Sequence, residues 1–287
     1  MLVQEPLFRL FPFRSLGSTM DEARALARRG FSGAAIVRAD TQTSGRGRIG
    51  GRRWVDSPGQ SLLMTLLLPA GFNEGQALPL RAGLGVVRAL ERVSPAGCRP
   101  AGCGSSGTGP AAQSPSPSPE FWLKWPNDVL ARKSAGAAFS PAAPSGAAGY
   151  GKLCGILCES AGGRILIGIG MNLRRAAPAQ PQPDIQPACL EETWGFLPPP
   201  FGELDGAAQF VARHVTDALS DPRWRSEYER RLWGLGSTLR FLAGHPQSPE
   251  SVQGTCVGVD GEGRLILDIG GEQKTFASGE IASLRLV

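Results

Sequence analysis

Apolar residues in the first hundred positions follow helical spacing in some segments and strand spacing in others. Residues 18–30 predict a helix, because Thr19 can cap its start, Glu22 follows three positions later and Gly30 can end it. Two apolar runs, at residues 32–40 and 61–69, predict buried strands. Residues 77–93 return to the spacing of a helix.

The middle of the chain continues this mixture. Residues 121–130 predict a strand that breaks at Pro126, and residues 152–160 and 163–173 predict two strands that could pair as a hairpin. Helical spacing returns at residues 203–220 and 222–233. We therefore predict an α+β fold in which helices pack on a mixed β-sheet.

The pattern changes again near residue 236. Short apolar stretches separated by glycine turns, at residues 251–260, 264–270, 272–280 and 281–287, are typical of a small barrel of about 50 residues. We predict two domains, at residues 1–235 and 236–287. Two segments rich in Ser, Gly, Pro and Ala, at about 95–119 and 132–150, predict flexible insertions in the first domain.

Composition narrows the class of protein. The net charge of +5 is compatible with anionic substrates or with a nucleic acid. The amino terminus lacks the pattern of a signal peptide, and no apolar run approaches the roughly 20 residues of a membrane helix. Six cysteines and two histidines at irregular spacing predict neither a disulfide framework nor a zinc site, so we expect a cytoplasmic protein.

The loop at residues 43–59, "TSGRGRIGGRRWVDSPG", combines flexible backbone with positive charge. It places four glycines and four arginines between Gly45 and Trp54. Glycines let backbone N–H groups surround an anion, arginines add forked donors, and Trp54 offers a flat apolar face. The loop therefore suits a phosphate and a purine, although a Gly/Arg segment that binds RNA loosely has the same composition.

Further polar residues stand at the ends of predicted strands. In "KWPND", Asp128 could meet a metal ion or a ligand hydroxyl, and Lys124 could meet a phosphate or pair with Asp128. Lys152 opens the next strand, in which Gly155 allows close backbone approach. Asn172 ends the strand after that, where its amide could read an adenine edge or bond a turn.

Taken together, these segments resemble the biotin–protein ligase family over most of the chain outside the two insertions. The matching pieces occur in the order of the family: "ST" at 18–19, "QTSGRGR" at 42–48, Trp54, "KWPND" at 124–128, "KLCGIL" at 152–157 and "GIGMN" at 168–172. The closing "GEIASLRL" at 279–286 resembles the end of the family's SH3-like barrel. The resemblance implies a catalytic domain of the class II synthetase and biotin ligase type.

The resemblance also implies an activity and a set of site residues. The chain would use ATP and Mg²⁺ to activate biotin as biotinyl-5′-AMP, and then transfer biotin to a lysine of a biotin carboxyl carrier domain. The implied biotin-binding residues are Ser18, Thr19, Gln42, Gly45, Arg46, Gly47, Arg48, Lys152 and Gly155. The implied nucleotide-binding residues are Arg48, Trp54, Asn127, Asp128, Lys152 and Asn172, with Asp128 as the candidate metal ligand.

Three of these residues would carry the chemistry. Arg46, Arg48 and Lys152 would neutralise the biotin carboxylate and the α-phosphate, which otherwise repel each other. No DNA or membrane partner is expected, because the "ST" motif comes too early to leave room for a winged-helix domain, and the chain could form a homodimer.

The sequence departs from the family pattern in three places. Met20 stands where the family usually has Asn, and an extra glycine leaves open whether Arg52 or Arg53 is the third arginine of the loop. An insertion also separates "KWPND" from Lys152. The alternative functions are a lipoate–protein ligase-like acyltransferase and a nucleic-acid-binding protein that uses the Gly/Arg loop.

Overall fold

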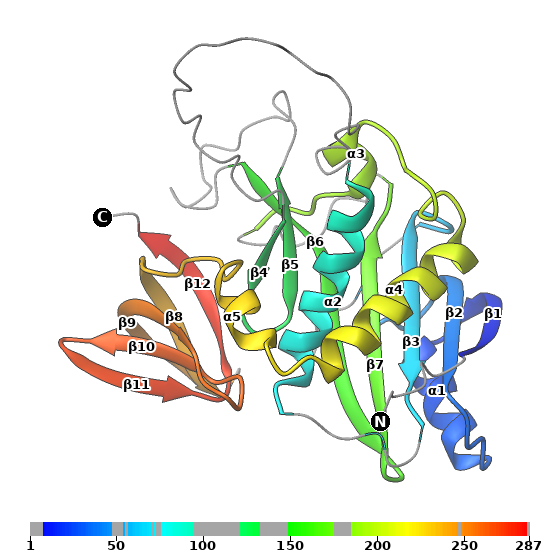
Figure 1. The fold of residues 1–287 in the computed structure, drawn as a ribbon, viewed down its shortest axis with the longest axis horizontal. Coiled ribbons are helices and arrows are strands. Elements are labelled where there is room, and N and C mark those ends of the chain that lie inside the picture. The colour runs from blue at the N-terminus through cyan, green and yellow to red at the C-terminus, as the bar shows by residue number, and fades with distance from the viewer. Residues whose placement is uncertain are drawn as a thin grey trace, which may run out of the picture.

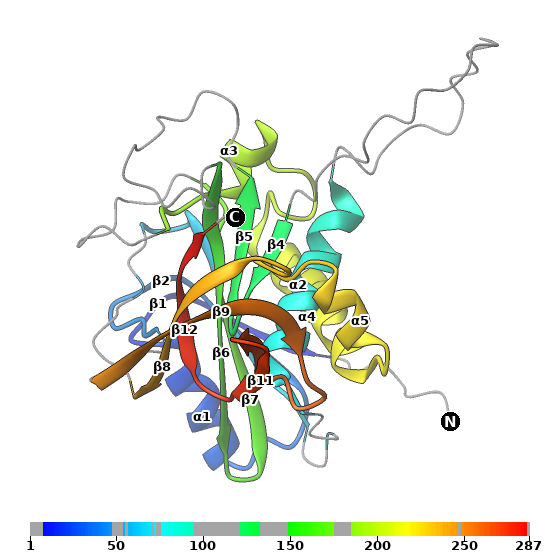
Figure 2. The same cartoon turned by 90° about the vertical axis from the view of Figure 1, so that its left-hand side faces the viewer.

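The protein is built on two β-sheets with helices packed around the larger one (Figures 1 and 2). The computed structural model describes residues 8–47, 54, 57–69, 72, 76–94, 121–132, 149–174, 185–245 and 248–285. The two predicted insertions lie outside these residues, except for residues 132, 149 and 150 at their edges.

The larger sheet has seven strands in the order β1-β2-β3-β7-β6-β5-β4. Strands β1 and β2 run parallel and every other neighbouring pair is antiparallel, so the sheet is mixed as predicted. The strands are β1 (Arg9–Leu16), β2 (Ala35–Gln42), β3 (Ser61–Leu67), β4 (Phe121–Lys124), β5 (Asp128–Arg132), β6 (Tyr150–Ala161) and β7 (Arg164–Asn172). The predicted hairpin of β6 and β7 is confirmed, whereas β1 was not predicted from the sequence.

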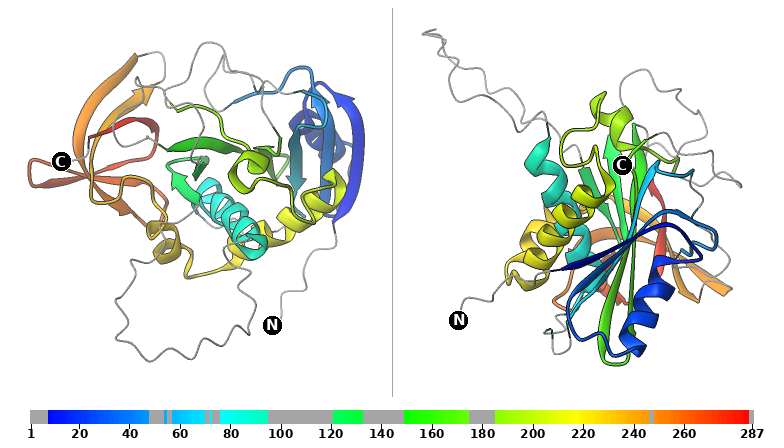
Figure 3. Two further views of the ribbon diagram at one scale, coloured as in Figure 1. Left: turned by 90° about the horizontal axis from the view of Figure 1, so that it is seen from above. Right: turned by 90° about the vertical axis from the view of Figure 1, so that its right-hand side faces the viewer.

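Helices cover both faces of this sheet, and the right-hand view of Figure 3 shows the two layers. They are α1 (Thr19–Arg28), α2 (Leu78–Val93), α3 (Leu190–Trp194), α4 (Leu204–Ser220) and α5 (Trp224–Glu229). On β3, Leu62 and Leu66 join the core formed with α2 and α4, while Leu67 joins a second core under α1. Burial on both faces explains why β3 is an unbroken apolar run rather than an alternating one.

The start of α1 corrects one detail of the sequence-based prediction. Ser18, not Thr19, is the N-cap residue, and its side chain makes no capping hydrogen bond. Thr19 is the first helical residue, and its backbone N–H and its hydroxyl both donate to the side chain of Gln42 on β2. A bond to a neighbouring strand therefore replaces the expected local cap.

Helices α2 and α4 pack closely against each other on the far face. A Cβ added at Gly85 of α2 would lie 2.5 Å from the Cα of Val215 on α4, so only glycine fits there. Among the described residues, no helix combines the length and apolar character needed to cross a membrane.

The second sheet is a five-stranded antiparallel unit, which we call the C-terminal barrel. Its strands are β8 (Thr238–His245), β9 (Ser248–Val259), β10 (Leu265–Ile269), β11 (Glu272–Phe276) and β12 (Gly279–Arg285), in the order β11-β10-β9-β8-β12. The barrel lies beside β4 and α5 at one end of the larger sheet (Figure 1). The predicted fold class, a mixed sheet with helices followed by a small β-barrel, is confirmed.

Candidate functional site

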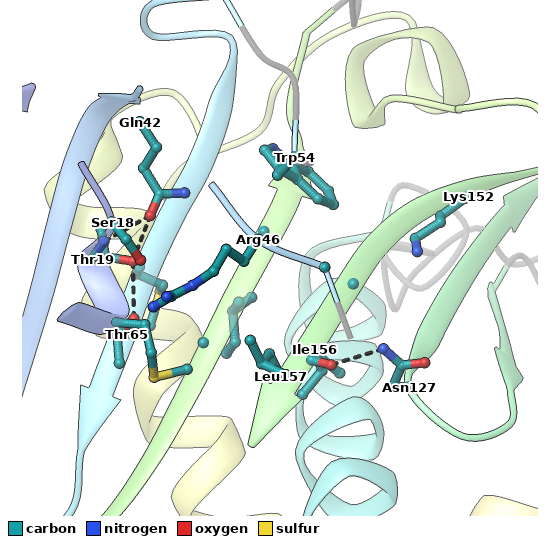
Figure 4. Close-up of a pocket in the computed structure, with 17 residues that line it drawn as sticks. Ser18, Thr19, Gln42, Arg46, Trp54, Thr65, Asn127, Lys152, Ile156 and Leu157 are labelled. Atoms are coloured by element: carbon teal, nitrogen blue, oxygen red, sulfur yellow. Dashed lines mark hydrogen bonds between the residues drawn. The ribbon is translucent and has the colours of Figure 1, made fainter. Parts of the chain in front are cut away.

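A pocket opens on the α1 face of the larger sheet and brings together segments that are far apart in the sequence (Figure 4). Nine of the predicted site residues line it: Ser18, Thr19, Gln42, Arg46, Gly47, Trp54, Asn127, Lys152 and Gly155. In Figure 4, the first three lie on one side of the pocket, while Asn127 and Lys152 lie on the other. The arrangement thus has two ends, which differ in their chemistry.

One end carries a chain of hydrogen bonds from β3 to β2. The buried hydroxyl of Thr65 donates to Thr19 Oγ1 over 2.9 Å, and Thr19 Oγ1 donates to Gln42 Oε1 over 3.1 Å. The backbone N–H of Thr19 also donates to Gln42 Oε1, over 2.7 Å. Because an N–H can bond only to the carbonyl oxygen of the amide, the Nε2 group of Gln42 is left as a donor for a ligand.

Arg46 reaches across the pocket from the glycine–arginine loop (Figure 4). Its guanidinium pairs with the carboxylate of Asp21. Its Nη2 lies 2.5 Å from Asp21 Oδ1, which also accepts from Arg24, and Arg24 in turn pairs with Glu159 on β6. Burial raises the pKa of Asp21, but the hydrogen bonds and charges of Arg46 and Arg24 outweigh this effect and hold the pKa below its ordinary value. The carboxylate is therefore ionised, and it neutralises Arg46 in this structure.

Lys152 provides a second cation at the opposite end of the pocket. Its Nζ lies 2.7 Å from Asp128 Oδ1, and its side chain is 38% exposed. Its backbone is fixed on both sides, since its N–H donates to the carbonyl of Gln186 and its carbonyl accepts from the N–H of Ala188. The ammonium group can thus move while the residue that carries it stays in place.

The indole ring of Trp54 packs against two glycines, which lie opposite each other on neighbouring strands. Gly155 of β6 pairs with Gly170 of β7, and a Cβ at Gly170 would lie 3.0 Å from the indole of Trp54. A Cβ at Gly155 would lie 3.4 Å from the same ring and 3.5 Å from Lys152 Nζ. The glycine pair therefore makes room for the tryptophan and for the lysine, as the prediction of close approach at Gly155 requires. Gly45 accepts a backbone hydrogen bond from Trp54 at the start of the loop.

Two of the described predicted residues, Asn172 and Asp128, do not line the pocket themselves. Asn172 does not line the pocket, because its amide donates to the carbonyls of Ala188 and Lys152, over 3.0 and 3.4 Å. This geometry makes Asn172 a support for Lys152, and the adenine contact of Asn172 stays a prediction. Asp128 reaches the pocket through its pair with Lys152. Arg48 lies outside the described residues.

Lys124, which the sequence placed near a phosphate or Asp128, also lies away from the pocket. It is 7% exposed, and its Nζ is 4.0 Å from Glu280 Oε1 of the barrel. In the register of β4 with β5, Lys124 lies directly opposite Asp128, while the carboxylate of Asp128 forms an ion pair with Lys152.

Sequence reasoning did not assign a ligand role to several residues of the pocket wall. They are Met64, Thr65, Ile156, Leu157, Gly168, Ile169 and Gly170. Thr65 carried a signal, since it is one hydroxyl in the middle of the apolar run of β3. Met20 also lines the pocket, and a Cβ at Gly168 would lie 2.8 Å from its methyl group. The departure from the family pattern at Met20 thus gives this wall a thioether in place of an amide.

The described residues near the pocket include a cysteine, but its thiol is not reactive. Burial raises the pKa of Cys154 far above its ordinary value, so this neighbour of Gly155 stays neutral and unreactive. The described residues include no group of three or more His, Cys, Asp or Glu side chains placed to hold a metal ion. The site therefore offers cations, amides and hydroxyls, a set that suits a ligand with a carboxylate and phosphates.

Comparison with known proteins assigns the chain to a family. Residues 18–174 match the biotin/lipoate A/B protein ligase family, and residues 248–283 match the biotin protein ligase C-terminal domain. A biotin–[acetyl-CoA-carboxylase] ligase of Mycobacterium tuberculosis is 29% identical over 92% of this chain and 84% of its own length. The enzyme of that name from Paracoccus denitrificans is 31% identical over 87% of this chain and 90% of its own length.

Solved structures agree with this fold. The biotin protein ligase of Aquifex aeolicus in complex with biotin and ATP has a TM-score of 0.68 at 23% identity, and the match covers 97% of this chain and 99% of that one. The ligase of Leishmania major in complex with biotinyl-5-AMP has a TM-score of 0.57 at 23% identity, with 94% and 99% covered. The family match extends from Ser18 at one end of the pocket to the end of β7, so the pocket lies within it. The chain therefore belongs to the biotin/lipoate A/B protein ligase family.

Proposed function

We propose that this protein is an ATP-dependent biotin–protein ligase, which makes biotinyl-5′-AMP and then transfers biotin to a lysine of a biotin carboxyl carrier domain. The observation that carries the proposal is the two-ended pocket, in which a hydroxyl–amide chain faces a lysine–aspartate pair across an arginine. The family match and the names of the relatives support the same reaction. The match to a biotin ligase C-terminal domain favours biotin over lipoate.

The polar end of the pocket suits the ring system of biotin. Gln42 Nε2 can donate to a ligand oxygen, while the hydroxyls of Ser18, Thr19 and Thr65 lie close by. The apolar wall, with Met20 and Leu157, matches the hydrocarbon part of such a ligand. Gly45 and Gly47 let the loop approach the ligand closely.

The cationic end suits the reacting groups. In the first step, an oxygen of the biotin carboxylate bonds to the α-phosphorus while the bond to pyrophosphate breaks. Arg46 and Lys152, with Arg48 proposed from the sequence, would cancel the repulsion between the two anions. One such donor is typically worth about 3–4 kcal/mol of the activation barrier.

The second step moves the acyl group to the carrier. The neutral lysine amine attacks the acyl carbon and a C–N bond forms. AMP leaves with the electrons of the broken C–O bond, and the nitrogen releases one proton to the solvent. Until that attack, closure of the loop would keep water away from the mixed anhydride. The ring of Trp54, which packs on the glycine pair near Lys152, would stack against the adenine.

We also propose that Mg²⁺ accompanies ATP, with Asp128 as the candidate ligand from the protein. Asp128 is one carboxylate beside the pocket, and one or two carboxylates completed by phosphates and water are a usual setting for Mg²⁺. When bound, the ion would offset charge on the leaving pyrophosphate.

Other parts of the proposal rest on the sequence and on the relatives. A carrier domain of acetyl-CoA carboxylase as protein substrate follows from the names of the relatives. A catalytic domain at 1–235 with a barrel at 236–287, a cytoplasmic location and a homodimer are proposals from the sequence.

The test is adenylate formation by the full chain. Incubation with ATP, Mg²⁺ and biotin should yield biotinyl-AMP by mass spectrometry, while lipoate in place of biotin should yield little product. Lys152→Ala should lower the rate by about 10²- to 10³-fold, because it removes a charge-stabilising donor. Lys274→Ala on β11, which also removes a partly exposed paired lysine, is the matched control and should be fully active.

Three outcomes would contradict the proposal. Lack of adenylate under conditions in which a known ligase makes it would remove the reaction. A preference for lipoate would move the function to the acyltransferase alternative. Tight binding of RNA that weakens steeply with salt, without adenylate, would favour the nucleic-acid alternative.

A further inference from the structure

A tryptophan joins the loop between β4 and β5 to the C-terminal barrel. Trp125 is 2% exposed, and its ring centroid lies 5.8 Å from that of Phe241 on β8. Its Nε1 donates to the carbonyl of Gly263, over 2.9 Å, in the turn between β9 and β10. One side chain thus attaches the loop to two parts of the barrel, through a ring contact and a directed hydrogen bond.

The barrel turn that accepts this bond is itself tightly held. Gly263 has φ +82°, and a Cβ there would lie 2.5 Å from the Cβ of Ala77, just before α2. On β12, which lies next to β8, Glu280 Oε1 is 4.0 Å from the Nζ of Lys124, the residue before Trp125. The barrel and the loop between β4 and β5 therefore form a closely packed interface. A displacement of the barrel would shift the loop, and a displacement of the loop would shift the barrel.

The same loop reaches the pocket within two residues. Asn127 donates from Nδ2 to the carbonyl of Ile156 over 2.9 Å, and it accepts from the N–H of Ile156 over 2.9 Å. The next residue, Asp128, lies 2.7 Å from Lys152 Nζ. Since Asn127, Ile156 and Lys152 line the pocket, the position of this loop sets one end of the site.

We propose that Trp125 is a positioning residue through which the C-terminal barrel fixes the nucleotide end of the pocket. It holds the loop so that Asn127 bonds to β6 and Asp128 orients the Lys152 ammonium. The biotin end, built by Ser18, Thr19 and Gln42, comes from α1 and β2 on the other side of the pocket, so it does not depend on this contact (Figure 4). This inference rests on the proposed function, because it assigns the two ends of the pocket to nucleotide and to biotin.

The experiment compares two tryptophans of one hairpin. Trp125→Phe keeps a ring against Phe241 but removes the N–H that Gly263 accepts. Trp122→Phe, on β4, is the matched control, because the buried Nε1 of Trp122 has no hydrogen-bond partner among the described residues. Measurements are KM for ATP and for biotin in adenylate formation, with Kd for biotin alone and for a non-hydrolysable ATP analogue by calorimetry.

We expect Trp125→Phe to raise KM for ATP and Kd for the analogue by about fivefold, the usual size for loss of one hydrogen bond. Kd for biotin should stay within about twofold of the wild-type value, because the biotin end of the pocket comes from other elements. A general structural defect would instead weaken the binding of both ligands. Trp122→Phe should change neither quantity. Equal behaviour of the two variants, or equal weakening of biotin and nucleotide by Trp125→Phe, would overturn the inference.

Two further measurements keep the test decisive. If Trp125→Phe does not fold, Glu280→Gln on the barrel should raise Kd for the ATP analogue by about twofold, and an unchanged Kd would overturn the inference. If the wild type makes no biotinyl-AMP, the proposed function fails, yet the analogue affinities of the variants still test the role of Trp125. An active wild type with an unaltered Trp125→Phe variant contradicts only this inference.

Discussion

Each cation of the pocket that the structure describes forms an ion pair with an aspartate. Arg46 pairs with Asp21, and Lys152 pairs with Asp128. The carboxylate and phosphate of a ligand would replace these aspartates as the ion-pair partners of the two cations. The cations are therefore paired both before and after the ligand binds. Because the side chains of Arg46 and Asp21 are both about half exposed, exchange of this pair costs little. The side chain of Asp128 is only 15% exposed, so releasing Lys152 from it costs more.

The Asp21 pair predicts that removing the aspartate charge strengthens biotin binding. Asp21→Asn frees Arg46, and since an exposed ion pair is worth about 0.2–1 kcal/mol, Kd for biotin should fall by up to about fivefold in calorimetry. The folded-state pKa of Asp21 is lowered, so the wild-type pair is present at neutral pH and is lost only as the pH falls through that lowered pKa. The difference between variant and wild type should therefore be constant between about pH 6 and 8.

The control for this prediction is Glu159→Gln. Glu159 pairs with Arg24 at the other end of the same chain of charges, but it is not a partner of Arg46. It should leave Kd for biotin unchanged. Weaker biotin binding by Asp21→Asn would show that the aspartate holds Arg46 in its binding position and does not compete with the ligand.

At the scale of elements, the pairing of β6 with β7 forms the surface against which Trp54 packs. The register places Gly155 opposite Gly170, and the sheet there has no side chains to keep the indole away. A slip of one residue would place larger neighbours in this position. The loop that carries Trp54 thus depends on strand register as much as on its own glycines.

Gly170→Ala should therefore impair the site while leaving the fold intact. Gly170 does not have a positive φ, so alanine is allowed, but its Cβ would lie 3.0–3.1 Å from three atoms of Trp54 and push the ring away. A displacement of this kind should lower the rate of adenylate formation by about 10- to 100-fold, and tryptophan fluorescence should change. Gly202→Ala, where an added Cβ meets nothing within 4 Å, should be neutral. A fully active Gly170→Ala variant would show that the position of Trp54 is unimportant.

The sequence predicted the elements whose burial is regular and missed those that depend on distant partners. Strands β2, β3, β6 and β7 appear as apolar runs, because the sheet buries them. Strand β1 mixes exposed and half-buried residues at the sheet edge, so its apolar pattern is weak. Its place is set by parallel pairing with β2, which no local pattern contains.

The same distinction applies to the site. Thr19, Gln42, Trp54 and Lys152 were found through motifs, and the structure brings them to one pocket. The support by Asn172 depends on the carbonyls of Lys152 and Ala188, which are distant in sequence and meet it only in the folded chain. The roles of Arg46 and Lys152 toward a ligand remain predictions, which the variants described above test.

At the scale of the whole molecule, the pocket connects parts of the protein that otherwise share only the sheet. Its polar end belongs to α1, β2 and β3, and its cationic end belongs to β5, β6 and, through Trp125, to the barrel. A ligand that reaches both ends would add contacts between them in the native state and none in the unfolded chain. Such a ligand should stabilise the molecule as a unit.

Biotin and ATP together should therefore raise the melting temperature by more than the sum of their separate effects, because they react to one molecule that spans both ends. A ligand at 100 times its Kd adds about 2.7 kcal/mol, which corresponds to roughly 5–10 °C for a domain of this size. Differential scanning fluorimetry with biotin, with ATP and with both measures the three shifts in the presence of Mg²⁺. Lys152→Ala is the control: it should keep most of the shift with biotin, whose rings bind at the other end of the pocket, and lose most of the excess with both ligands, because it forms the adenylate far more slowly. Additive shifts in the wild type would mean that the two ends of the pocket bind their ligands independently, and the picture of one continuous site would then be wrong.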